Sequence, residues 1–365
     1  MKIVKVITGL GMGGAETQVC LLADKLSAEG HHVTIISLVG ESINIPVNKN
    51  IEVIELRMKK NILGLIASLY KLVSIFLTVK PNVIHAHMYH ANIMARIAAS
   101  FTLSRGKLIC TAHSNNEGGR IRMLSYRLTD FMCSKTTNVS KRALNHFISL
   151  KAFKRNKSEV VYNGLNFDRF KFSNSNAVKI RGEFNIPEDT KVILSVGRLT
   201  EAKDYPNLFK AVSKLNDQKY ILLIVGEGEL RGELEQVVER LNLESRVIFA
   251  GIRTDVHEFY SAADIFVLAS RWEGFGLVVA EAMGAGCPVV STDCGGVSEV
   301  VGCNDYIVPT NDYNALALKI DEILSLSENQ KKIIVEKNRN HVINHFSIDK
   351  IVNKWLGIYN SKVKN

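Results

Sequence analysis

Motifs that pair cysteines or bind metals are missing from this chain of 365 residues. Its six cysteines include no C-x-x-C pair, and none lies near a histidine at zinc-ligand spacing. The simplest interpretation is six buried or idle thiols in a reducing compartment. The N-terminus also lacks a signal-peptide pattern, because a glycine-rich turn ends its short apolar run by residue 9. Together these absences predict a cytoplasmic protein.

Low-complexity tracts and internal repeats are lacking too, which argues against a disordered chain and against a solenoid. Apolar residues make up 46% and charged residues 22% of the chain, which is ordinary for a globular protein. Because 365 residues exceed what a single hydrophobic core commonly serves, two domains are expected.

Acidic residues are scarce in the first half of the chain. Residues 1–170 hold 23 Lys and Arg against 10 Asp and Glu, whereas residues 171–365 hold 23 against 26. Between Arg120 and Lys157, ten cations are opposed only by Asp130. Such a cluster either binds an anionic partner (a lipid surface, a polyphosphate or nucleic acid) or is an ordinary solvated face. If it binds a membrane, three apolar residues are expected to insert shallowly: Phe147, Ile148 and Phe153.

One apolar run, residues 62–79, approaches the length of a membrane span. Lys71 lies at its centre, where a charge is costly in hydrocarbon, and Pro81 follows its end. A helix packed against a sheet is therefore the favoured interpretation. A helix at a membrane surface is the second interpretation, and a true span is the least favoured.

Apolar, β-branched runs alternate with helix-spaced segments along both halves of the chain. Residues 3–8 and 33–39 flank a helix expected over 15–29, and residues 191–197 and 220–225 open a second series. This alternation predicts two α/β domains with parallel sheets and a ligand cleft at the carboxyl ends of the strands. The other expected elements are strands at 82–86, 108–112, 246–249, 264–268 and 288–291 and helices at 205–216, 229–242 and 277–285.

The first glycine-rich turn places Gly9, Gly11 and Gly14 at G-x-G-x-x-G spacing between a strand and a helix. Dinucleotide-binding domains use this spacing, and Glu41 follows the second strand where a ribose-binding acid would lie. The same turn also serves as a plain structural turn, or for any ligand that approaches a helix N-terminus. The motif alone therefore leaves a nicotinamide-dependent oxidoreductase open.

The most informative segment runs from Ser270 to Gly296. Glu273 lies in the loop after a strand, and Glu281 lies about one turn into the following helix. Glycines between them open the backbone so that amides at the helix start can face an anion. Two carboxylates beside an amide-lined anion pocket predict a nucleotide-sugar site.

This segment resembles the E-x7-E motif of retaining glycosyltransferases with the GT-B fold, in particular glycosyltransferase family 4. The resemblance extends along nearly the whole chain, although Asn82 replaces an acid that is usual in the family. It implies an α/β fold of two Rossmann-like domains facing across a cleft, with a terminal helix that crosses back to the first domain. The matching stretches are GMGGAE at 11–16, PNVIHAH at 81–87, VYNGLNFDRF at 161–170, VGRLTEAKD at 196–204 and VGEGELR at 225–231.

The resemblance also implies roles for single residues. Arg198 and Lys203 would hold the donor diphosphate, whose negative charge grows as the glycosidic bond breaks. Glu273 would bind hydroxyls of the donor sugar, Glu281 would bind the ribose, and His113 would face the reacting carbon. His113 and Glu273 are thus the expected catalytic residues. Further donor contacts are expected from the backbone of Gly14, Gly276 and Leu277.

No D-x-D triplet, which commonly holds a divalent metal in other glycosyltransferases, occurs in the chain. A site without metal or cofactor is therefore expected, with two cations and helix amides neutralising the diphosphate. His85 and His87 are expected to point to opposite faces of their strand, so that at most one lines the cleft. The first domain is expected to bind the acceptor, with three candidate contacts: Ser114, Asn115 and Asn116.

The expected domains are residues 1–170 on the acceptor side, residues 171–345 for the nucleotide sugar, and a helix at 346–365 that packs back on the first domain through Trp355. A linker is expected at 164–190. The expected reaction moves a hexose or N-acetylhexosamine, with retention, from a nucleotide sugar (commonly UDP-linked) to a lipid-linked or saccharide acceptor. The setting would be O-antigen or lipopolysaccharide synthesis in the cytoplasm, at an anionic inner membrane face and without nucleic acid. The alternatives are an NAD-dependent oxidoreductase and a non-catalytic nucleotide-binding protein.

Overall fold

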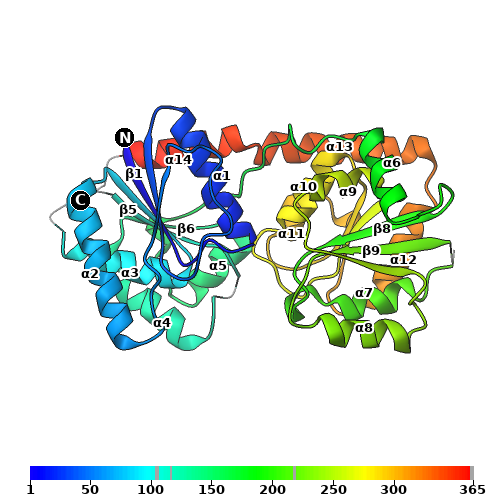
Figure 1. Ribbon diagram of the computed structural model, residues 1–365, viewed down its shortest axis with the longest axis horizontal. Helices are drawn as coiled ribbons and strands as arrows, with labels where there is room; N and C mark the ends of the chain where they lie inside the picture. Colours follow the sequence, from blue (N-terminus) through cyan, green and yellow to red (C-terminus); the bar gives the residue numbers. More distant parts are fainter. Residues whose placement is uncertain (103–106, 116, 217–218, 362–365) are drawn as a thin grey trace. The chain divides into compact units, whose positions relative to one another are not determined.

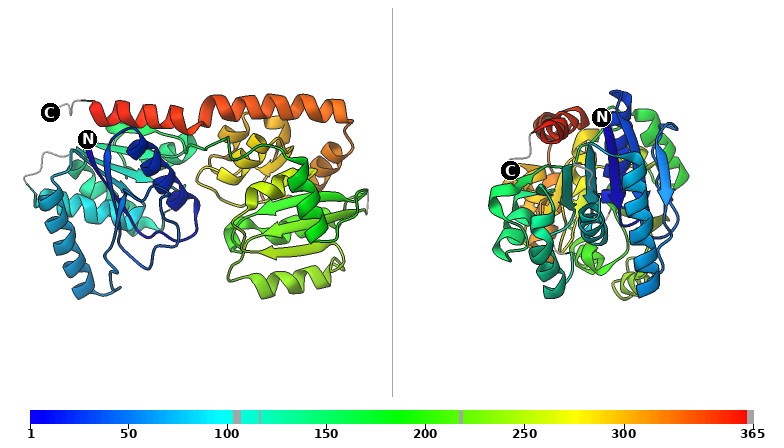
Figure 2. Two further views of the ribbon diagram at one scale, coloured as in Figure 1. Left: turned by 45° about the horizontal axis from the view of Figure 1, so that its top comes forward. Right: turned by 90° about the vertical axis from the view of Figure 1, so that its left-hand side faces the viewer.

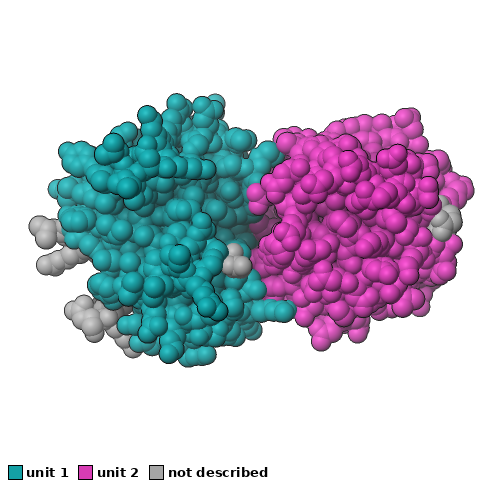
Figure 3. Space-filling model, turned by 90° about the horizontal axis from the view of Figure 1, so that it is seen from below, with its two compact units in different colours: residues 1–164, 348–365 teal, residues 165–347 magenta. Residues whose placement is uncertain are grey.

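The computed structural model describes four stretches of the chain: residues 1–102, 107–115, 117–216 and 219–361. The chain forms two compact units, each with its own sheet and core. Unit 1 consists of Met1–Gly164 and Ile348–Asn365, and unit 2 consists of Leu165–Ser347 (Figure 3).

Unit 1 is built on a parallel sheet with the strand order β3-β2-β1-β4-β5-β6-β7 (Figure 1). Its central strands β1 (Lys2–Ile7) and β4 (Val83–His87) are largely apolar and buried on both faces, as a parallel sheet covered by helices requires. The other strands are β2 (His32–Ser37), β3 (Glu52–Glu55), β5 (Lys107–Ala112), β6 (Lys135–Asn138) and β7 (Ser158–Val160).

Helices cover both faces of this sheet (Figure 1). α1 (Gly14–Ala28) and α14 (Ile348–Asn360) share an apolar core with one face. α2 (Ile62–Val79) and α3 (Tyr89–Ser100) share the core on the other face. Two further helices complete the unit: α4 (Arg120–Thr129), which contacts α3, and α5 (Lys141–Ser149), which contacts β6 and β7.

The terminal helix α14 belongs to unit 1, as the resemblance implied. Trp355 on this helix is 4% exposed, and its ring centroid lies 4.3 Å from that of His85. Lys107 Nζ donates to the carbonyl of Ile358 at 2.7 Å, which ties the last turn to β5. Figure 2 shows α14, in red, lying along the first part of the chain. The helix therefore closes the core of a unit whose other residues lie far away in the sequence.

The apolar helix α2 is packed on one side only. Leu72 and Phe76 are buried in the core of unit 1, which confirms a helix packed against the sheet. Most of its other side chains are exposed, and only 17% of the run is buried. Within the described residues it is the single helix that is long and apolar enough to cross a membrane, by length and composition alone.

The basic segment from Arg120 to Lys157 turns partly inward. Lys157 Nζ lies 3.1 Å from the buried carboxylate of Asp130. Phe147 is 0% exposed and Phe153 is 2% exposed, since both pack in one small core with Tyr126. The expectation that these two rings insert into a membrane is therefore wrong: they complete the interior of unit 1.

Unit 2 repeats the plan with a parallel sheet in the order β10-β9-β8-β11-β12-β13. The apolar strands β8 (Lys191–Val196) and β9 (Tyr220–Val225) lie near its middle. The other strands are β10 (Val247–Gly251), β11 (Ile265–Leu268), β12 (Val289–Thr292) and β13 (Ile307–Val308). Its helices are α6 (Asn174–Glu183), α7 (Tyr205–Val212), α8 (Arg231–Arg240), α9 (Val256–Ala262), α10 (Leu277–Ala285), α11 (Val297–Val301), α12 (Tyr313–Leu324) and α13 (Glu328–Phe346).

Nearly all of the stretch expected to be a linker, residues 164–190, is part of unit 2. It contains α6, which packs against α9. Arg181 Nη2 pairs with Asp264 Oδ2 at 3.0 Å and ties the end of α6 to the start of β11. Only Ile180 of this helix is buried, so its hydrophobic pattern was too weak to predict it.

Candidate functional site

Two glycines fix the loop between β11 and α10. Gly276 has φ of 93°, and a Cβ there would come within 2.9 Å of Val297 Cγ2. Gly295 has φ of 57°, and a Cβ there would lie 1.8 Å from the carbonyl oxygen of Glu273. A larger residue at either position would displace the loop. The backbone that carries Glu273 is therefore set by close packing.

Glu273 and Lys203, both predicted for the donor site, form an ion pair in this loop region. Lys203 ends the short 3-10 helix η3 (Glu201–Lys203), and its Nζ lies 2.5 Å from Glu273 Oε1. The Ser270 hydroxyl donates to the same oxygen at 2.8 Å. The side chains of Lys203 and Glu273 are 18% and 15% exposed, so solvent screens the pair only in part. The structure thus brings two predicted residues together and adds Ser270, which the sequence did not reveal.

Arg271 holds the η3 turn in place. Its Nε lies 3.0 Å from Asp204 Oδ2, and its backbone amide donates to the carbonyl of Ala202 at 2.9 Å. Asp204 is 3% exposed and adopts a left-handed φ of 47°. The signal in the sequence was the opposite charge of Arg271 and Asp204, since Asp204 follows Lys203 directly and Arg271 lies two residues before Glu273. Arg271 therefore positions Lys203 and is not itself assigned to a ligand.

An anion at this edge of the sheet would meet favourable charge from several directions. Arg198, exposed, follows β8, and Lys203 lies a few residues later. The first amides of α10, beginning at Leu277, have no partner inside their own helix and carry the positive end of its dipole. Because β8 and β11 are neighbours in the sheet, their carboxyl ends share this edge. The arrangement suits a diphosphate.

Glu281, the second carboxylate of the predicted pair, lies one turn into α10 and is half-buried. The Tyr260 hydroxyl donates to its Oε2 at 2.8 Å. Burial raises the pKa of the Glu281 carboxyl, while the Tyr260 hydrogen bond and the charge of Arg169 oppose that rise. This carboxylate is held in a fixed rotamer, as a hydroxyl-binding group requires.

His113 lies directly after β5 in unit 1, half-buried. Its Nε2 lies 3.0 Å from His87 Nδ1, and its backbone amide donates to Glu117 Oε1 at 3.1 Å. Burial, together with the nearby charge of Lys5, lowers the pKa of His113 to about 3. The ring is therefore neutral at physiological pH and acts as a hydrogen-bonding group.

His85 and His87 point to the same side of β4, so the expectation of opposite faces is wrong. Residues two apart on a strand share a face, and the two ring centroids lie 4.0 Å apart. His85 Nδ1 lies 2.7 Å from the Tyr359 hydroxyl, and its Nε2 lies 2.7 Å from Thr111 Oγ1. His85 is thereby tied to α14, whereas His87 is tied to His113.

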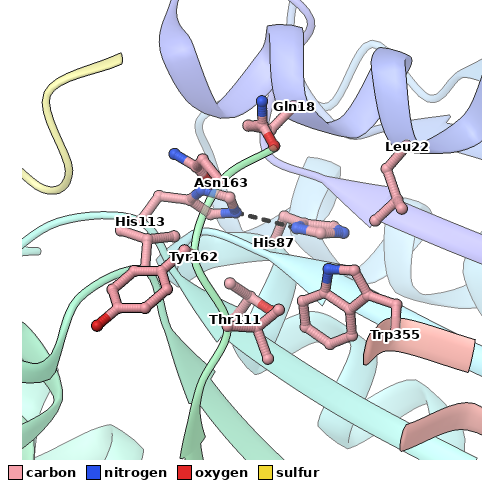
Figure 4. A pocket seen from close by; sticks show the side chains of 10 residues that line it. Gln18, Leu22, His87, Thr111, His113, Tyr162, Asn163 and Trp355 are labelled. Carbon is pink, nitrogen blue, oxygen red and sulfur yellow. Dashed lines mark hydrogen bonds between the residues drawn. The ribbon is translucent and has the colours of Figure 1, made fainter. Parts of the chain in front are cut away.

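A small pocket with both polar and apolar lining lies beside these histidines, between the sheet of unit 1 and the helices α1 and α14 (Figure 4). Gln18 closes one side, where its amide exchanges hydrogen bonds with the backbone of Gly164 at 2.5 and 2.8 Å. His87 Nε2 and His113 Nδ1 are buried and have no partner among the described residues. Two neutral imidazole nitrogens are thus left for a neutral hydroxyl or a water. The remaining lining residues are Leu22, Thr111, Val139, Val161, Tyr162, Asn163 and Trp355.

The other predicted residues of unit 1 lie at the carboxyl ends of its strands. Gly14 is the exposed first residue of α1, just after the turn that follows β1. Ser114 and Asn115 follow His113 and are half-buried, and Asn115 Oδ1 has no partner among the described residues. The predicted contact Asn116 lies outside the described residues.

Metal-binding side chains do not cluster in the part of the chain that the structure describes. No three His, Cys, Asp or Glu side chains gather there as a metal ion would need. All six cysteines are free, and five of them are buried.

Two family models match consecutive parts of the chain. The model described as Glycosyltransferase Family 4 matches residues 12–169, and the model described as Glycosyl transferases group 1 matches residues 177–341. Together they span both units almost completely.

Curated relatives match along most of their length. An uncharacterized glycosyltransferase of Methanocaldococcus jannaschii is 28% identical, covering 95% of this chain and 94% of its own. The Escherichia coli enzyme UDP-Gal:alpha-D-GlcNAc-diphosphoundecaprenol alpha-1,3-galactosyltransferase is 26% identical, covering 82% and 79%.

Solved structures share the whole fold. A glycosyltransferase from Rickettsia africae superposes with a TM-score of 0.87 at 25% identity, covering 100% of this chain and 99% of its own. Anabaena HepE, solved with UDP and glucose, superposes with a TM-score of 0.85 at 23% identity, covering 99% and 100%.

Proposed function

Since the chain belongs to glycosyltransferase family 4, we propose that it transfers a hexose or an N-acetylhexosamine from a UDP-sugar to a lipid-linked or saccharide acceptor, with retention of configuration. The observation that carries this proposal is the Lys203–Glu273 pair beside the start of α10. It joins a cation for a diphosphate, from the turn after β8, to a carboxylate for sugar hydroxyls, from the loop after β11.

In this mechanism the residues of unit 2 stabilise the leaving group. As the bond between the sugar and the phosphate breaks, negative charge grows on the nucleoside diphosphate. Arg198, Lys203 and the α10 amides meet that charge, and the Lys203 ammonium and the helix amides are already oriented before reaction. Glu273 hydrogen-bonds hydroxyls of the donor sugar and Glu281 those of the ribose. No metal and no cofactor is needed in this proposal.

In unit 1, neutral side chains contact the uncharged donor sugar and the acceptor. His113 faces the donor sugar as a hydrogen-bonding group, and His87 fixes its ring at 3.0 Å. Ser114, Asn115 and Asn116 contact the acceptor, and Gly14 lets the first loop approach the diphosphate. These roles are carried over from the family, and the neutrality of His113 supports them.

The proposed acceptor belongs to bacterial surface-polysaccharide synthesis, of the O-antigen or lipopolysaccharide type. The name of the Escherichia coli relative includes a lipid-diphosphate acceptor and a UDP-sugar donor, and HepE was solved with UDP. A lipid-linked acceptor would keep the enzyme at the inner face of the inner membrane, where the basic first unit suits anionic lipid.

A donor panel tests the proposal. The purified chain is incubated with UDP-glucose, UDP-galactose, UDP-N-acetylglucosamine and GDP-mannose, and nucleotide release is measured with and without a polyprenyl-diphosphate sugar. UDP and NAD are compared by thermal shift, where a ligand at 100 times its Kd adds about 2.7 kcal/mol of apparent stability. Release from a UDP-sugar together with a shift by UDP supports the proposal. A shift by NAD and none by UDP overturns it.

A further inference from the structure

The outer side of α2 is unusually apolar for a surface helix. Leu63, Ile66, Tyr70 and Leu77 form one outward stripe, and Leu63 and Tyr70 are 78% and 76% exposed. A helix that only covers a sheet turns such residues inward. Leu72 and Phe76 already provide that packing from the opposite side. The outward stripe is therefore not explained by the core of unit 1.

A second exposed stripe lies on α4, whose end continues into η1 (Asp130–Met132). Ile121 is 84% exposed, and the residues that follow it at spacings of three and four are exposed too. Spacings of three, four and three keep these side chains on one helix face. Besides Ile121, this stripe consists of Leu124, Leu128 and Phe131.

The two stripes lie on the same side of the unit 1 sheet. α3 contacts both α2 and α4 and lies between them, as Figure 1 shows. We call the exposed apolar residues of these two helices, together with Phe131, the α2–α4 face. Contiguous or neighbouring apolar areas of this kind mark an interaction surface.

The surroundings of this face carry charge of one sign. Residues 56–158 contain 18 Lys and Arg and two acids, Glu117 and Asp130. Asp130 is 2% exposed and pairs with Lys157. The Glu117 carboxyl accepts from the His113 amide and the Tyr126 hydroxyl. Three of these cations are paired with acids: Lys157 with Asp130, Lys135 with Glu159, and Arg57 with Glu55 and Glu41. The stretch as a whole still carries a large excess of positive charge.

Exposed cations border both stripes. Lys59 and Lys60 precede α2, and Arg120 and Arg127 lie on α4 beside its apolar stripe. Apolar side chains rimmed by exposed Lys and Arg match an anionic bilayer surface. A second copy would bring the same cations face to face, and nucleic acid would leave the aliphatic stripes unused.

We infer that the α2–α4 face is a docking surface for an anionic phospholipid bilayer. The two stripes enter the boundary between headgroups and acyl chains, and the bordering cations contact lipid phosphates. α2 lies in the interface and does not span it, because Leu72 and Phe76 are committed to the core of unit 1 and Lys71 lies mid-helix. Docking through this face would bring the enzyme to the proposed lipid-linked acceptor, and in that respect it rests on the proposed function. Binding to the bilayer itself requires no acceptor.

Vesicle sedimentation of the full chain tests the surface. Vesicles rich in phosphatidylglycerol are compared with vesicles of phosphatidylcholine, at low and at high salt. The chain should bind the anionic vesicles at least about tenfold more tightly, and high salt should weaken binding, since the Debye length falls from about 10 Å to about 3 Å. Equal binding to both vesicles, or binding to neither, overturns the inference.

Matched variants locate the surface. The apolar variant L63Q/I66Q/Y70Q should bind anionic vesicles at least about tenfold more weakly, since three exposed apolar side chains are lost. Its control, L318Q/I333Q, changes two exposed apolar residues of unit 2 and should bind like the original chain. The charge variant R120E/R127E should also lose about tenfold or more. Its control, K154E/R155E, reverses two exposed cations elsewhere in unit 1.

A thermal shift with UDP separates this inference from the proposed function. Both docking variants should keep the UDP shift and a normal melting temperature, which shows that they fold. Weak vesicle binding with an intact UDP shift supports the docking surface. If K154E/R155E loses binding and the α2–α4 variants keep it, another basic surface binds and the inference fails. A chain that binds vesicles but shows no UDP shift contradicts the proposed function alone.

Discussion

The two units share one architecture but hold their polar groups in opposite ways. In unit 2 the candidate site is built from charged pairs, Lys203 with Glu273 and Arg271 with Asp204. In unit 1 the candidate site lies beside buried groups that are driven toward neutrality. Burial lowers the pKa of Lys5 to about 7 and that of His113 to about 3.

This difference agrees with the proposed chemistry. Charged, preorganised groups suit a diphosphate that gains charge during reaction, whereas neutral donors and acceptors suit the hydroxyls of a sugar. Two kinds of experiment test this contrast: removing a charged side chain from unit 2, and titrating a buried group of unit 1.

The largest effect is expected from Lys203→Ala. It removes one fixed cation from the developing diphosphate charge, and loss of one such contact costs roughly 10²–10³ in kcat. Arg198→Ala should cost a comparable factor. Steady-state release of UDP from the preferred donor measures both. The control Lys332→Ala removes an exposed lysine of α13 and should leave kcat unchanged. Near-normal kcat in both site variants would refute the phosphate site.

A smaller but structural effect is expected from Gly295→Ala. Its Cβ would lie 1.8 Å from the carbonyl oxygen of Glu273, and its φ of 57° adds strain, so the loop must move. Strain of this kind costs on the order of 1–3 kcal/mol. The melting temperature should fall and the KM for the donor should rise. The control Gly232→Ala, where a Cβ meets nothing within 4 Å on α8, should keep or raise stability.

The titration of Glu117 offers a subtler comparison. Burial raises the pKa of its carboxyl to about 7, against hydrogen bonds from Tyr126 and the His113 amide. The folded state therefore holds the proton more tightly than the unfolded state. Its contribution to stability is full below the unfolded pKa of 4.5 and is lost as pH rises through about 7.

Glu117→Gln mimics the protonated acid and should cancel this loss. Between pH 5 and 8 its free energy of unfolding should fall less than that of the original chain, by on the order of 2 kcal/mol. Urea titrations at several pH values measure the free energy of unfolding of both proteins. Both contain the same histidines, so the contribution of the histidines cancels in the difference between them. Parallel pH profiles for the two proteins would show that Glu117 is already ionised in the fold.

No effect is expected from chelation. The proposed site neutralises the diphosphate with Arg198, Lys203 and helix amides, so EDTA should leave kcat/KM unchanged. Loss of activity in EDTA that manganese or magnesium restores would require a metal and would place unit 2 in a different mechanism.

The candidate site of unit 2 was easier to predict from sequence than that of unit 1, because its residues are close together in the sequence. Glu273, Gly276 and Glu281 lie within nine residues of one another, so one short motif carries the loop, the helix start and both carboxylates. The strand over 220–225 and the helix over 62–79 matched the structure because their apolar runs are continuous.

Contacts between distant residues could not be derived in that way. His85 meets Tyr359 across 274 positions, and Gln18 meets Gly164 across 146. The direction of Phe147 and Phe153 was likewise invisible, since an aromatic residue among cations reads as surface until the core behind it is known. Helix α6 was missed because it buries a single residue.

The placement of α14 has a consequence for how the protein is made. Most of unit 1 precedes unit 2 in the chain, yet unit 1 needs Trp355, Ile358 and Tyr359 to close its core. In the sequence, unit 2 lies between the two segments of unit 1. All of its residues are therefore made before α14, and it can fold before unit 1 is complete. Until α14 has been synthesised, part of one face of the unit 1 sheet stays uncovered, and His85 and Lys107 lack their partners on that helix. A premature stop before residue 348 would therefore damage the unit made first and spare the one made second.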